Sequence, residues 1–376
     1  MYRPLASHSP GFRDSQDNRN RQGSDPLTPM LEHPNVHAEW SSWSEEQTLH
    51  IAGVYSNPFR WKARRYHFND FVRHMRATAN VQLHVVELAY GARPFEVTEE
   101  GDPLAIRLRT DCEMFHKENL INIGVQHFPS DWKYGGYSDG DFHFTRHDWA
   151  LEAIHMLQHH EFVQLFSNYA DLTSATATSD TGHRVYRQNS SFAWNYLHQS
   201  EFKSLKQAQQ KLDPYYGHPI PTAVFPFGFP PGAPGGAWGW RRSAFDSVGG
   251  LLDTCVMGSA DWWMAFGLIG QVSMLRGDST VRSYNDDIRN WQKRAQVLTA
   301  NIGCVDNLAL HFYHGASSDR AYGNREGMLL NFGYDPRLDI TKDWRGVYRW
   351  TGNKPRLRDS VRKYFIDRKE DSPSYP

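Results

Sequence analysis

The sequence predicts an α/β fold in which a mixed, mostly parallel β-sheet is sandwiched by helices. Three observations predict it. Apolar, β-rich runs alternate with segments of helical periodicity between residues 48 and 160. Glycine or proline marks several of the transitions, and a chain of 376 residues can bury one large core. Strands and helices of this size in alternation are typical of a sheet covered by helices.

The first elements are two strands joined by a helix. Residues 48–58 (TLHIAGVYSNP) form an apolar, β-rich run that ends in a Ser-Asn-Pro loop. Residues 81–90 (VQLHVVELAY) form a second strand, which Gly91 stops. The segment between them has apolar residues at helical spacing: Phe68, Phe71, Val72 and Met75. We therefore expect a strand, a helix and a strand in this order.

The next part of the chain predicts a helix, a strand and a second helix. The helices cover residues 115–128 (FHKENLINIGVQHF) and 147–160 (HDWALEAIHMLQHH), and the strand lies within residues 132–142 (WKYGGYSDGDF). In sheets of this kind, ligands bind beyond the carboxyl ends of the strands. Asp139 and Asp141 are expected to lie there.

Three regions depart from this alternation. Residues 1–46 are polar and rich in Pro, Gly and Ser, which predicts a disordered N-terminal arm. Residues 172–238 are dense in Pro, Gly and aromatic residues, as in a lid or an insertion. Residues 341–376 form an amphipathic, charged tail. Its apolar residues suggest a stripe that docks on the protein: Leu357, Val361, Tyr364 and Phe365.

Composition excludes several classes of protein. The formal net charge is −1 and the pI is about 7.0, so no global positive field points to nucleic acid or an anionic membrane. Three widely spaced cysteines fit reduced thiols rather than a disulfide framework. There is no apolar signal-peptide core, and no apolar run is long enough to cross a bilayer. The expectation is a soluble protein of the cytoplasm, or of the host cytoplasm if the sequence is viral.

Asp139 and Asp141 form the only Asp-x-Asp pair in the chain and follow the small, apolar run YGGY. Two carboxylates at the end of a buried strand can hold a metal ion against a phosphate-bearing substrate. Asp-Gly is also a favoured turn dipeptide, and the pair by itself favours a simple turn over a metal site.

His311 and His314 stand three residues apart in LALHFYHG. Imidazoles together with carboxylates favour Mn, Zn or Fe over Ca. The alternative is chance, because the chain contains 19 histidines and they also cluster elsewhere.

A third signal combines glycines, tryptophans and one isolated acid. The segment GGAWGWRRSAFDSVGGLLD carries Trp238 and Trp240, and GSADWW follows with Asp261. Glycines permit close approach of the backbone to a ligand, tryptophans offer stacking faces, and a lone aspartate suits a catalytic base. A Gly-rich turn packed by aromatic residues explains the same pattern equally well.

The order of these motifs resembles that of the β-1,4-galactosyltransferase-like glycosyltransferases of GT-A fold. It runs from FHKENLINIGV through the strand ending in Asp-x-Asp to WGWRRSAFDSVGGL, GSAD and His-x-x-His. The resemblance spans about residues 49–330, with 172–238 outside it. It implies one catalytic domain at 47–340, with a nucleotide-sugar-binding half at 47–171 and an acceptor half with a metal-binding His loop at 239–340.

The resemblance implies roles residue by residue. Asp141 and His314 are implied as ligands of Mn²⁺ or Mg²⁺, with His311 as a further ligand and Asp139 as a contact to the nucleotide or the metal. Asp261 is implied as the general base. The implied nucleotide-sugar contacts are Asn57, Arg60, Arg64, Lys117, Asp139, Arg320 and Arg325. The implied acceptor contacts are Trp238, Trp240 and Trp262.

One departure from the family concerns the surroundings of Asp261. Ala260 precedes it and Trp262 and Trp263 follow, where the family has further acids that contact the acceptor sugar. This departure implies an acceptor other than the family's N-acetylglucosamine.

The function expected is that of a metal-dependent, inverting glycosyltransferase that uses a nucleotide-sugar, with a UDP-sugar favoured. Its hydroxyl acceptor is either a cytosolic glycan precursor or a hydroxymethylated base in DNA, as in phage enzymes that mask their genomes. One alternative is a sugar-phosphate nucleotidyltransferase, although no Gly-rich basic loop directly follows the first strand. The other is a carbohydrate- or nucleic-acid-binding module without activity. The sequence does not predict the oligomeric state.

Overall fold

The computed structural model describes residues 48–174, 183–198, 232–272, 281–320 and 325–373. All of them belong to one compact unit, Gln47–Pro376. The arm expected at residues 1–46, and most of the insertion expected at 172–238, lie outside the described residues.

The first elements follow the predicted order. β1 (Leu49–Ser56) leads into α2 (Lys62–Ala77), which is followed by β2 (Val81–Tyr90). The predicted strand, helix and strand are therefore confirmed. Three of the four apolar residues expected on the helix are fully buried: Phe68, Phe71 and Met75.

A seven-stranded sheet forms the centre of the fold, in the order β10-β6-β9-β4-β1-β2-β3. Its remaining strands are β3 (Ala105–Thr110), β4 (Tyr134–Ser138), β6 (Phe162–Gln164), β9 (Ala237–Arg241) and β10 (Ile302–Cys304). All neighbouring pairs are parallel except those of β9, which runs antiparallel to β4 and to β6. The sheet is mixed and mostly parallel, as predicted.

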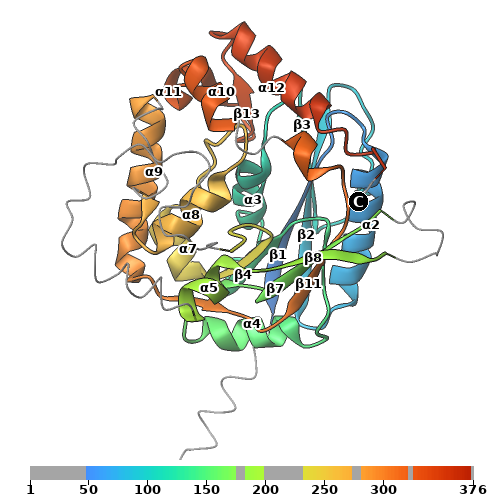
Figure 1. The fold of residues 1–376 in the computed structure, drawn as a ribbon, viewed down its shortest axis with the longest axis vertical. Coiled ribbons are helices and arrows are strands. Elements are labelled where there is room, and N and C mark those ends of the chain that lie inside the picture. Colours follow the sequence, from blue (N-terminus) through green and yellow to red (C-terminus); the bar gives the residue numbers. More distant parts are fainter. Residues whose placement is uncertain (1–47, 175–182, 199–231, 273–280, 321–324, 374–376) are drawn as a thin grey trace, which may run out of the picture. The chain divides into compact units, whose positions relative to one another are not determined.

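Helices cover both faces of this sheet. Ile51 packs in one cluster with residues of α2 and of α4 (Trp149–Leu157). Its neighbour Ala52 packs in another cluster, with α3 (Lys117–Val125). Successive residues of a strand point to opposite faces, so α2 and α3 lie on opposite sides of the sheet, as Figure 1 shows. The predicted α/β sandwich is confirmed.

The α3 side of the sheet carries further helices that shape the site. They are α5 (Phe192–His198), α7 (Arg242–Val248), α8 (Ala260–Leu268) and α9 (Arg282–Ala295), followed by the short 3₁₀ helix η3 (Gln296–Leu298). No helix among the described residues is long and apolar enough to cross a membrane.

A second, four-stranded sheet was not predicted from the sequence. It consists of β5 (Phe142–Phe144), β11 (Leu308–His311), β7 (Asn168–Leu172) and β8 (Val185–Ser190), in this order. β11 pairs antiparallel with β5 and parallel with β7, which places His311 opposite Phe142 and Asp171. This pairing brings three segments that are distant in the sequence to one place.

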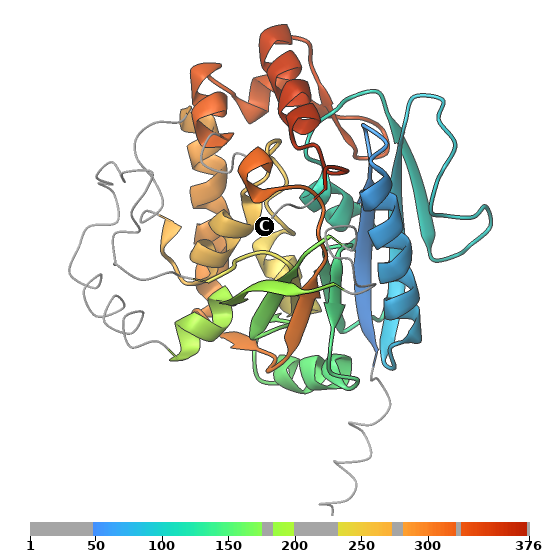
Figure 2. The same cartoon turned by 45° about the vertical axis from the view of Figure 1, so that its right-hand side comes forward.

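The last part of the chain packs as a helical subregion (Figure 2). It comprises η4 (Ser317–Arg320), α10 (Arg325–Asn331), α11 (Pro336–Asp339), β12 (Ile340–Lys342), β13 (Tyr348–Trp350) and α12 (Pro355–Asp367). All four side chains of the predicted docking stripe are buried on α12: Leu357, Val361, Tyr364 and Phe365. The stripe is therefore confirmed.

The close approach of β4 and β9 depends on a glycine pair, Gly136 and Gly239. A Cβ atom on Gly136 would stand 2.6 Å from the carbonyl oxygen of Trp238 and 3.2 Å from the Cα atom of Gly239. Backbone cannot give way as a flexible side chain can. We expect Gly136→Ala to destabilise the protein by about 1–3 kcal/mol, measured as a lower melting temperature.

Gly327 on α10 supplies the matched control, because a Cβ atom there meets nothing within 4 Å. Gly327→Ala should leave stability unchanged or raise it, since Ala favours a helix. Equal melting temperatures for the two variants would contradict the tight β4–β9 contact.

Candidate active site

A cavity of about 930 Å³ lies beyond the carboxyl ends of β1 and β4. Ser56 at the end of β1 lines it, as do Asp139 and Asp141, which follow β4. The two aspartates lie at the predicted end of the sheet. The opposite walls come from the second sheet and from the chain beyond α12.

The Asp-x-Asp motif forms a tight turn. The backbone N–H of Asp139 donates to the carbonyl oxygen of Gly236 at 2.7 Å, and the N–H of Phe142 donates back to the Asp139 carbonyl at 3.2 Å. The Asp141 carbonyl accepts from the N–H of Phe312 at 2.9 Å, which ties the motif to the segment after β11. The motif therefore finishes a turn and also directs the Asp141 side chain toward the histidines.

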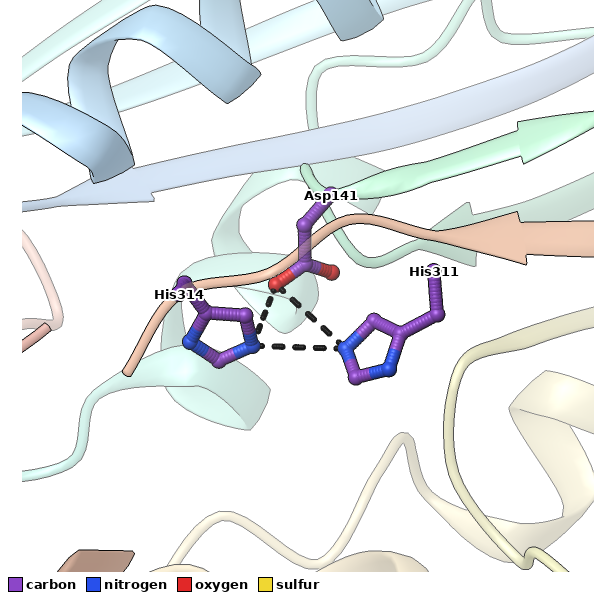
Figure 3. Close-up of side chains that lie close together, drawn as sticks. All are labelled: Asp141, His311 and His314. Carbon is purple, nitrogen blue, oxygen red and sulfur yellow. Dashed lines mark hydrogen bonds and ion pairs between the residues drawn. The ribbon is translucent and has the colours of Figure 1, made fainter. Parts of the chain in front are cut away.

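Asp141, His311 and His314 converge on one space (Figure 3). His314 Nε2 is 2.8 Å from Asp141 Oδ2, and His311 Nε2 is 3.8 Å from the same oxygen. The two imidazole Nε2 atoms are 3.3 Å apart. Among the His, Cys, Asp and Glu side chains of the described residues, these form the one group of three whose potential ligand atoms all lie within 4.8 Å of one another.

The chemistry of this group fits a divalent metal ion. Asp141 Oδ1 is buried and has no hydrogen-bond partner among the described residues. Burial, with Arg320 nearby, lowers the pKa of His314 to about 4, so its imidazole is neutral near pH 7. Burial opposes ionisation of Asp141, but His314, His311 and Arg320 outweigh it and hold its pKa well below the usual value. A carboxylate and neutral imidazoles are the protonation states that a metal requires.

Asp171 on β7 orients one of the imidazoles. His311 Nδ1 donates to Asp171 Oδ1 at 2.6 Å, which leaves Nε2 directed at Asp141. Arg187 on β8 donates to Asp171 Oδ2 through Nε at 2.8 Å and pairs with it through Nη2 at 2.7 Å. Carboxylates in this position fix the tautomer of metal-binding histidines. Asp171 and Arg187 were not predicted from the sequence, because a single charged residue in a short strand carries no distinctive local signal.

Lys117 and Asp139, both predicted to contact the nucleotide-sugar, lie together. Lys117 Nζ is 2.7 Å from Asp139 Oδ1 and 4.9 Å from the centre of the Tyr137 ring. Burial raises the pKa of Asp139, and Lys117 opposes that rise. Asp139 is thus paired with Lys117 and is not part of the cluster formed by Asp141 and the histidines.

The basic segment after β1 divides into residues at and away from the cavity. Arg64 lines the cavity, where its guanidinium binds Glu370 at 2.6 and 2.8 Å and donates to the Ser56 carbonyl at 2.8 Å. Asn57 accepts from the N–H of Trp61 and donates to its carbonyl, each at 2.9 Å, so its side chain organises the loop. The side chain of Arg60 is 67% exposed, and neither Asn57 nor Arg60 lines the cavity.

Arg320 and Arg325, two further predicted nucleotide-sugar contacts, are buried and line the cavity. Arg325 Nε donates to the Tyr364 hydroxyl at 2.7 Å, and this hydroxyl donates to the Arg320 carbonyl at 2.9 Å. Tyr364 belongs to the docking stripe of α12, so the tail supports both arginines.

Asp261 stands in the first turn of α8 and lines the cavity together with Trp262. Its Oδ1 accepts from the N–H of Trp262 at 3.0 Å. A Cβ atom on Gly235 would lie 2.5 Å from Asp261 Oδ2, so a larger residue there would displace the carboxylate from its present position. The carboxylate predicted as the base therefore reaches the same cavity as Asp141.

Trp238 and Trp240 occupy different surroundings from those predicted. Trp240 is fully buried and Trp238 is 5% exposed, and both pack in the core cluster that also contains residues of α3 and α7. Trp238 Nε1 donates to the Pro234 carbonyl at 2.8 Å. Neither side chain lines the large cavity. Because the alternation of β9 points both rings into the core, their positions give no support to acceptor contacts.

Comparisons with known proteins add little. No model of a known protein family matches the sequence, and no curated protein matches it. Among solved structures, the chain is similar to a mutant Drosophila β-1,4-galactosyltransferase 7 in complex with manganese, UDP-Gal and xylobiose. The identity is 14% and the TM-score 0.30, over 69% of this chain and 65% of that one, so the chain spans less than two thirds of its length.

A second similar structure is a proposed nucleotide-diphospho-sugar transferase from Desulfovibrio desulfuricans. Its identity is 8% and its TM-score 0.29, over 71% of this chain and 82% of that one. Overlap at these scores carries no weight, so the function is argued from the site alone.

Proposed function

We propose that this protein is a metal-dependent glycosyltransferase of GT-A type that moves a sugar from a nucleotide-sugar, most simply a UDP-sugar, to a hydroxyl group. One observation carries the proposal. The cluster of Asp141, His311 and His314 lies in the same large cavity as the carboxylate of Asp261 and several buried arginines. A metal site, an anion-binding wall and a candidate base in one cavity are what this transfer requires.

Asp141, His311 and His314 are the residues that would hold the ion, and Mn²⁺ suits them because imidazole favours it over harder cations. When bound, the ion would neutralise charge on the diphosphate of the donor and of the departing nucleoside diphosphate. Mg²⁺ is the alternative to be compared in binding measurements.

The side chains supply the rest of the chemistry. Buried guanidinium groups at one end of the cavity favour the negative charge that develops on the leaving diphosphate. Asp261 accepts the proton of the incoming hydroxyl as the new glycosidic bond forms. The bond from the sugar to the diphosphate breaks in the same displacement, which inverts the configuration at the sugar carbon.

A donor-by-acceptor screen tests the proposal. Purified protein with Mn²⁺ is offered UDP-sugars and other nucleotide-sugars, each with glycan precursors and with DNA containing hydroxymethylcytosine, and released nucleoside diphosphate is measured. Sugar transfer to one acceptor class identifies it. If no nucleotide-sugar is consumed with any hydroxyl acceptor or with water, the protein is not a glycosyltransferase. Sugar binding that EDTA leaves unchanged would instead indicate a binding module.

Asp171 provides a prediction about the metal site. Asp171→Asn keeps the shape of the side chain but loses the charge that orients His311 through Nδ1. Loss of such a partner usually weakens metal binding by about 10- to 100-fold. We expect that decrease in Mn²⁺ affinity, measured by calorimetry without nucleotide. The exposed Asp148 supplies the control Asp148→Asn, and equal Mn²⁺ affinity in both variants would exclude the orienting role.

A further inference from the structure

Arg368 and Glu370, in the chain beyond α12, line the cavity. Asp371 accepts hydrogen bonds from the backbone N–H groups of Lys62 and Ala63, at 2.9 and 2.8 Å, at the start of α2. A Cβ atom on Gly315 would meet the carbonyl oxygen of Arg368 at 2.9 Å. Residues 368–371, which we call the tail segment, therefore lie between α2 and the loop that carries His314.

The tail segment brings opposite charges into a buried place. Glu370 is 2% exposed and Arg368 is 5% exposed, and Arg368 Nε is 2.9 Å from Glu370 Oε1. Arg64 binds the same carboxylate at 2.6 Å, and Arg320 lines the same end of the cavity. We call Arg64, Arg320, Arg368 and Glu370 the guanidinium cluster.

Two guanidiniums of the cluster, those of Arg64 and Arg368, share the carboxylate of Glu370. The Arg64 and Arg368 pairs hold the pKa of Glu370 at about 2 in spite of its burial, so this carboxylate is ionised. Burial lowers the pKa of Arg368, and Arg64 and Arg320 lower it further against the attraction of Glu370. Arg368 is thus a buried cation that shares its counter-ion with Arg64, and a buried charge that is incompletely compensated is costly. An anionic ligand would remove this cost.

The guanidinium cluster borders the group formed by Asp141, His311 and His314, which we call the metal cluster. Arg320 and Arg64 are both close enough to Asp141 to interact with it electrostatically, and Arg320 does so with His314. Lys117 and Asp139, the other charged pair at this end, neutralise each other. A ligand that spans the two clusters therefore has to carry several negative charges over a short distance.

We propose that Arg368 of the tail segment, together with Arg64 and Arg320, binds the diphosphate of the nucleotide donor, and that Glu370 occupies this subsite as a counter-ion in its absence. The proposal rests on the proposed function. Arg64 and Arg368 share one carboxylate, so a diphosphate, which carries at least two negative charges at neutral pH, can supply the counter-charge that Glu370 divides between them.

Calorimetry with Mn²⁺ tests the role of Arg368, using UDP and inorganic pyrophosphate as probes and the full chain. Arg368→Met should weaken both probes by about tenfold or more, because a charge-assisted hydrogen bond to phosphate is lost. Arg358→Met, at an exposed residue of α12 that pairs with Asp359, is the control and should bind both probes as the wild type does. If Arg368→Met fails to fold, Arg368→Lys replaces it and should weaken both probes severalfold, since Lys lacks the bidentate fork.

Glu370→Gln gives an effect of opposite sign. This variant should melt below the wild type without ligand, because Arg64 and Arg368 lose the carboxylate that they share. Pyrophosphate with Mn²⁺ should then raise its melting temperature by more than it raises that of the wild type. A purely structural role for the tail segment predicts the lower melting temperature without this extra rescue.

The outcomes separate the two proposals. Suppose that the Arg368→Met variant, or Arg368→Lys if it replaces that variant, binds both UDP and pyrophosphate as the wild type does. This result overturns the role of the tail segment and leaves the glycosyltransferase proposal standing. Absence of extra rescue in Glu370→Gln overturns the counter-ion role. A wild-type protein that binds neither UDP nor pyrophosphate with Mn²⁺ overturns both proposals.

Discussion

Asp141→Ala is expected to abolish Mn²⁺-dependent binding of a UDP-sugar while the protein remains folded. Asp141 is the only carboxylate in the cluster with His311 and His314, and its second oxygen is buried without a hydrogen-bond partner among the described residues. Without it, the two imidazoles remain with no anionic ligand beside them, and the affinity for Mn²⁺ should fall by more than the roughly 100-fold that loss of a supporting residue can cause. Donor binding falls with it, because the diphosphate loses its divalent counter-charge.

The measurement is calorimetric titration of UDP-sugar with and without Mn²⁺, accompanied by a melting curve. Asp148→Ala serves as the control, because Asp148 pairs with Arg146 at the surface, outside the cavity. Unchanged Mn²⁺-dependent binding in the Asp141→Ala protein would mean that the metal site lies elsewhere.

Asp261→Asn is expected to lower the rate of sugar transfer by about 10² to 10⁴, the usual range for loss of a positioned base. Asn keeps the oxygen that accepts from the N–H of Trp262, so the start of α8 should be preserved. Asp261 does not belong to the metal cluster, so donor affinity should change little. A role limited to helix stability predicts instead a loss of about 1 kcal/mol and little change in turnover.

Single-turnover rates, donor affinity and melting temperature distinguish these outcomes. Asp246→Asn is a matched control, because Asp246 lies on α7 and its exposed carboxylate pairs with Arg242 at the surface. Transfer at the wild-type rate by Asp261→Asn would exclude the base role and leave another group to accept the proton.

The parts of the fold that could be predicted from the sequence are those with strong local periodicity. β2 has the expected bounds, the ends of β1, α3 and α4 lie within three residues of those expected, and α2 lies between the two strands as expected, because long apolar runs carry a clear period. The location of Asp139 and Asp141 followed from the end of β4 and from the rule that parallel strands present ligands at their carboxyl ends. The second sheet was not predicted, because three of its strands are short or polar and carry no clear period.

The parts that could not be predicted depend on contacts between distant segments. The pattern at Trp238 and Trp240 fits stacking faces and core equally well, because the sequence does not say whether their side chains point to the core cluster or to a ligand cavity. Arg368 and Glu370 lie in a charged run that looks like a solvated helix end. Glu370 binds Arg64 across 306 positions of the chain, and no local pattern reports such a contact.

The anchoring of the tail segment has a consequence for how the protein loses activity. The hydrogen bonds that Asp371 accepts from the start of α2 are solvent-exposed and span 309 and 308 positions. Exposed hydrogen bonds that join segments far apart in the sequence open at a lower free energy of local unfolding than the hydrogen bonds of a buried sheet. In rising urea, nucleotide binding should therefore fail before the seven-stranded sheet unfolds. Amide protons near Lys62 and Ala63 should exchange with solvent well before those of β1, so inactivation would begin as a local opening rather than as global denaturation.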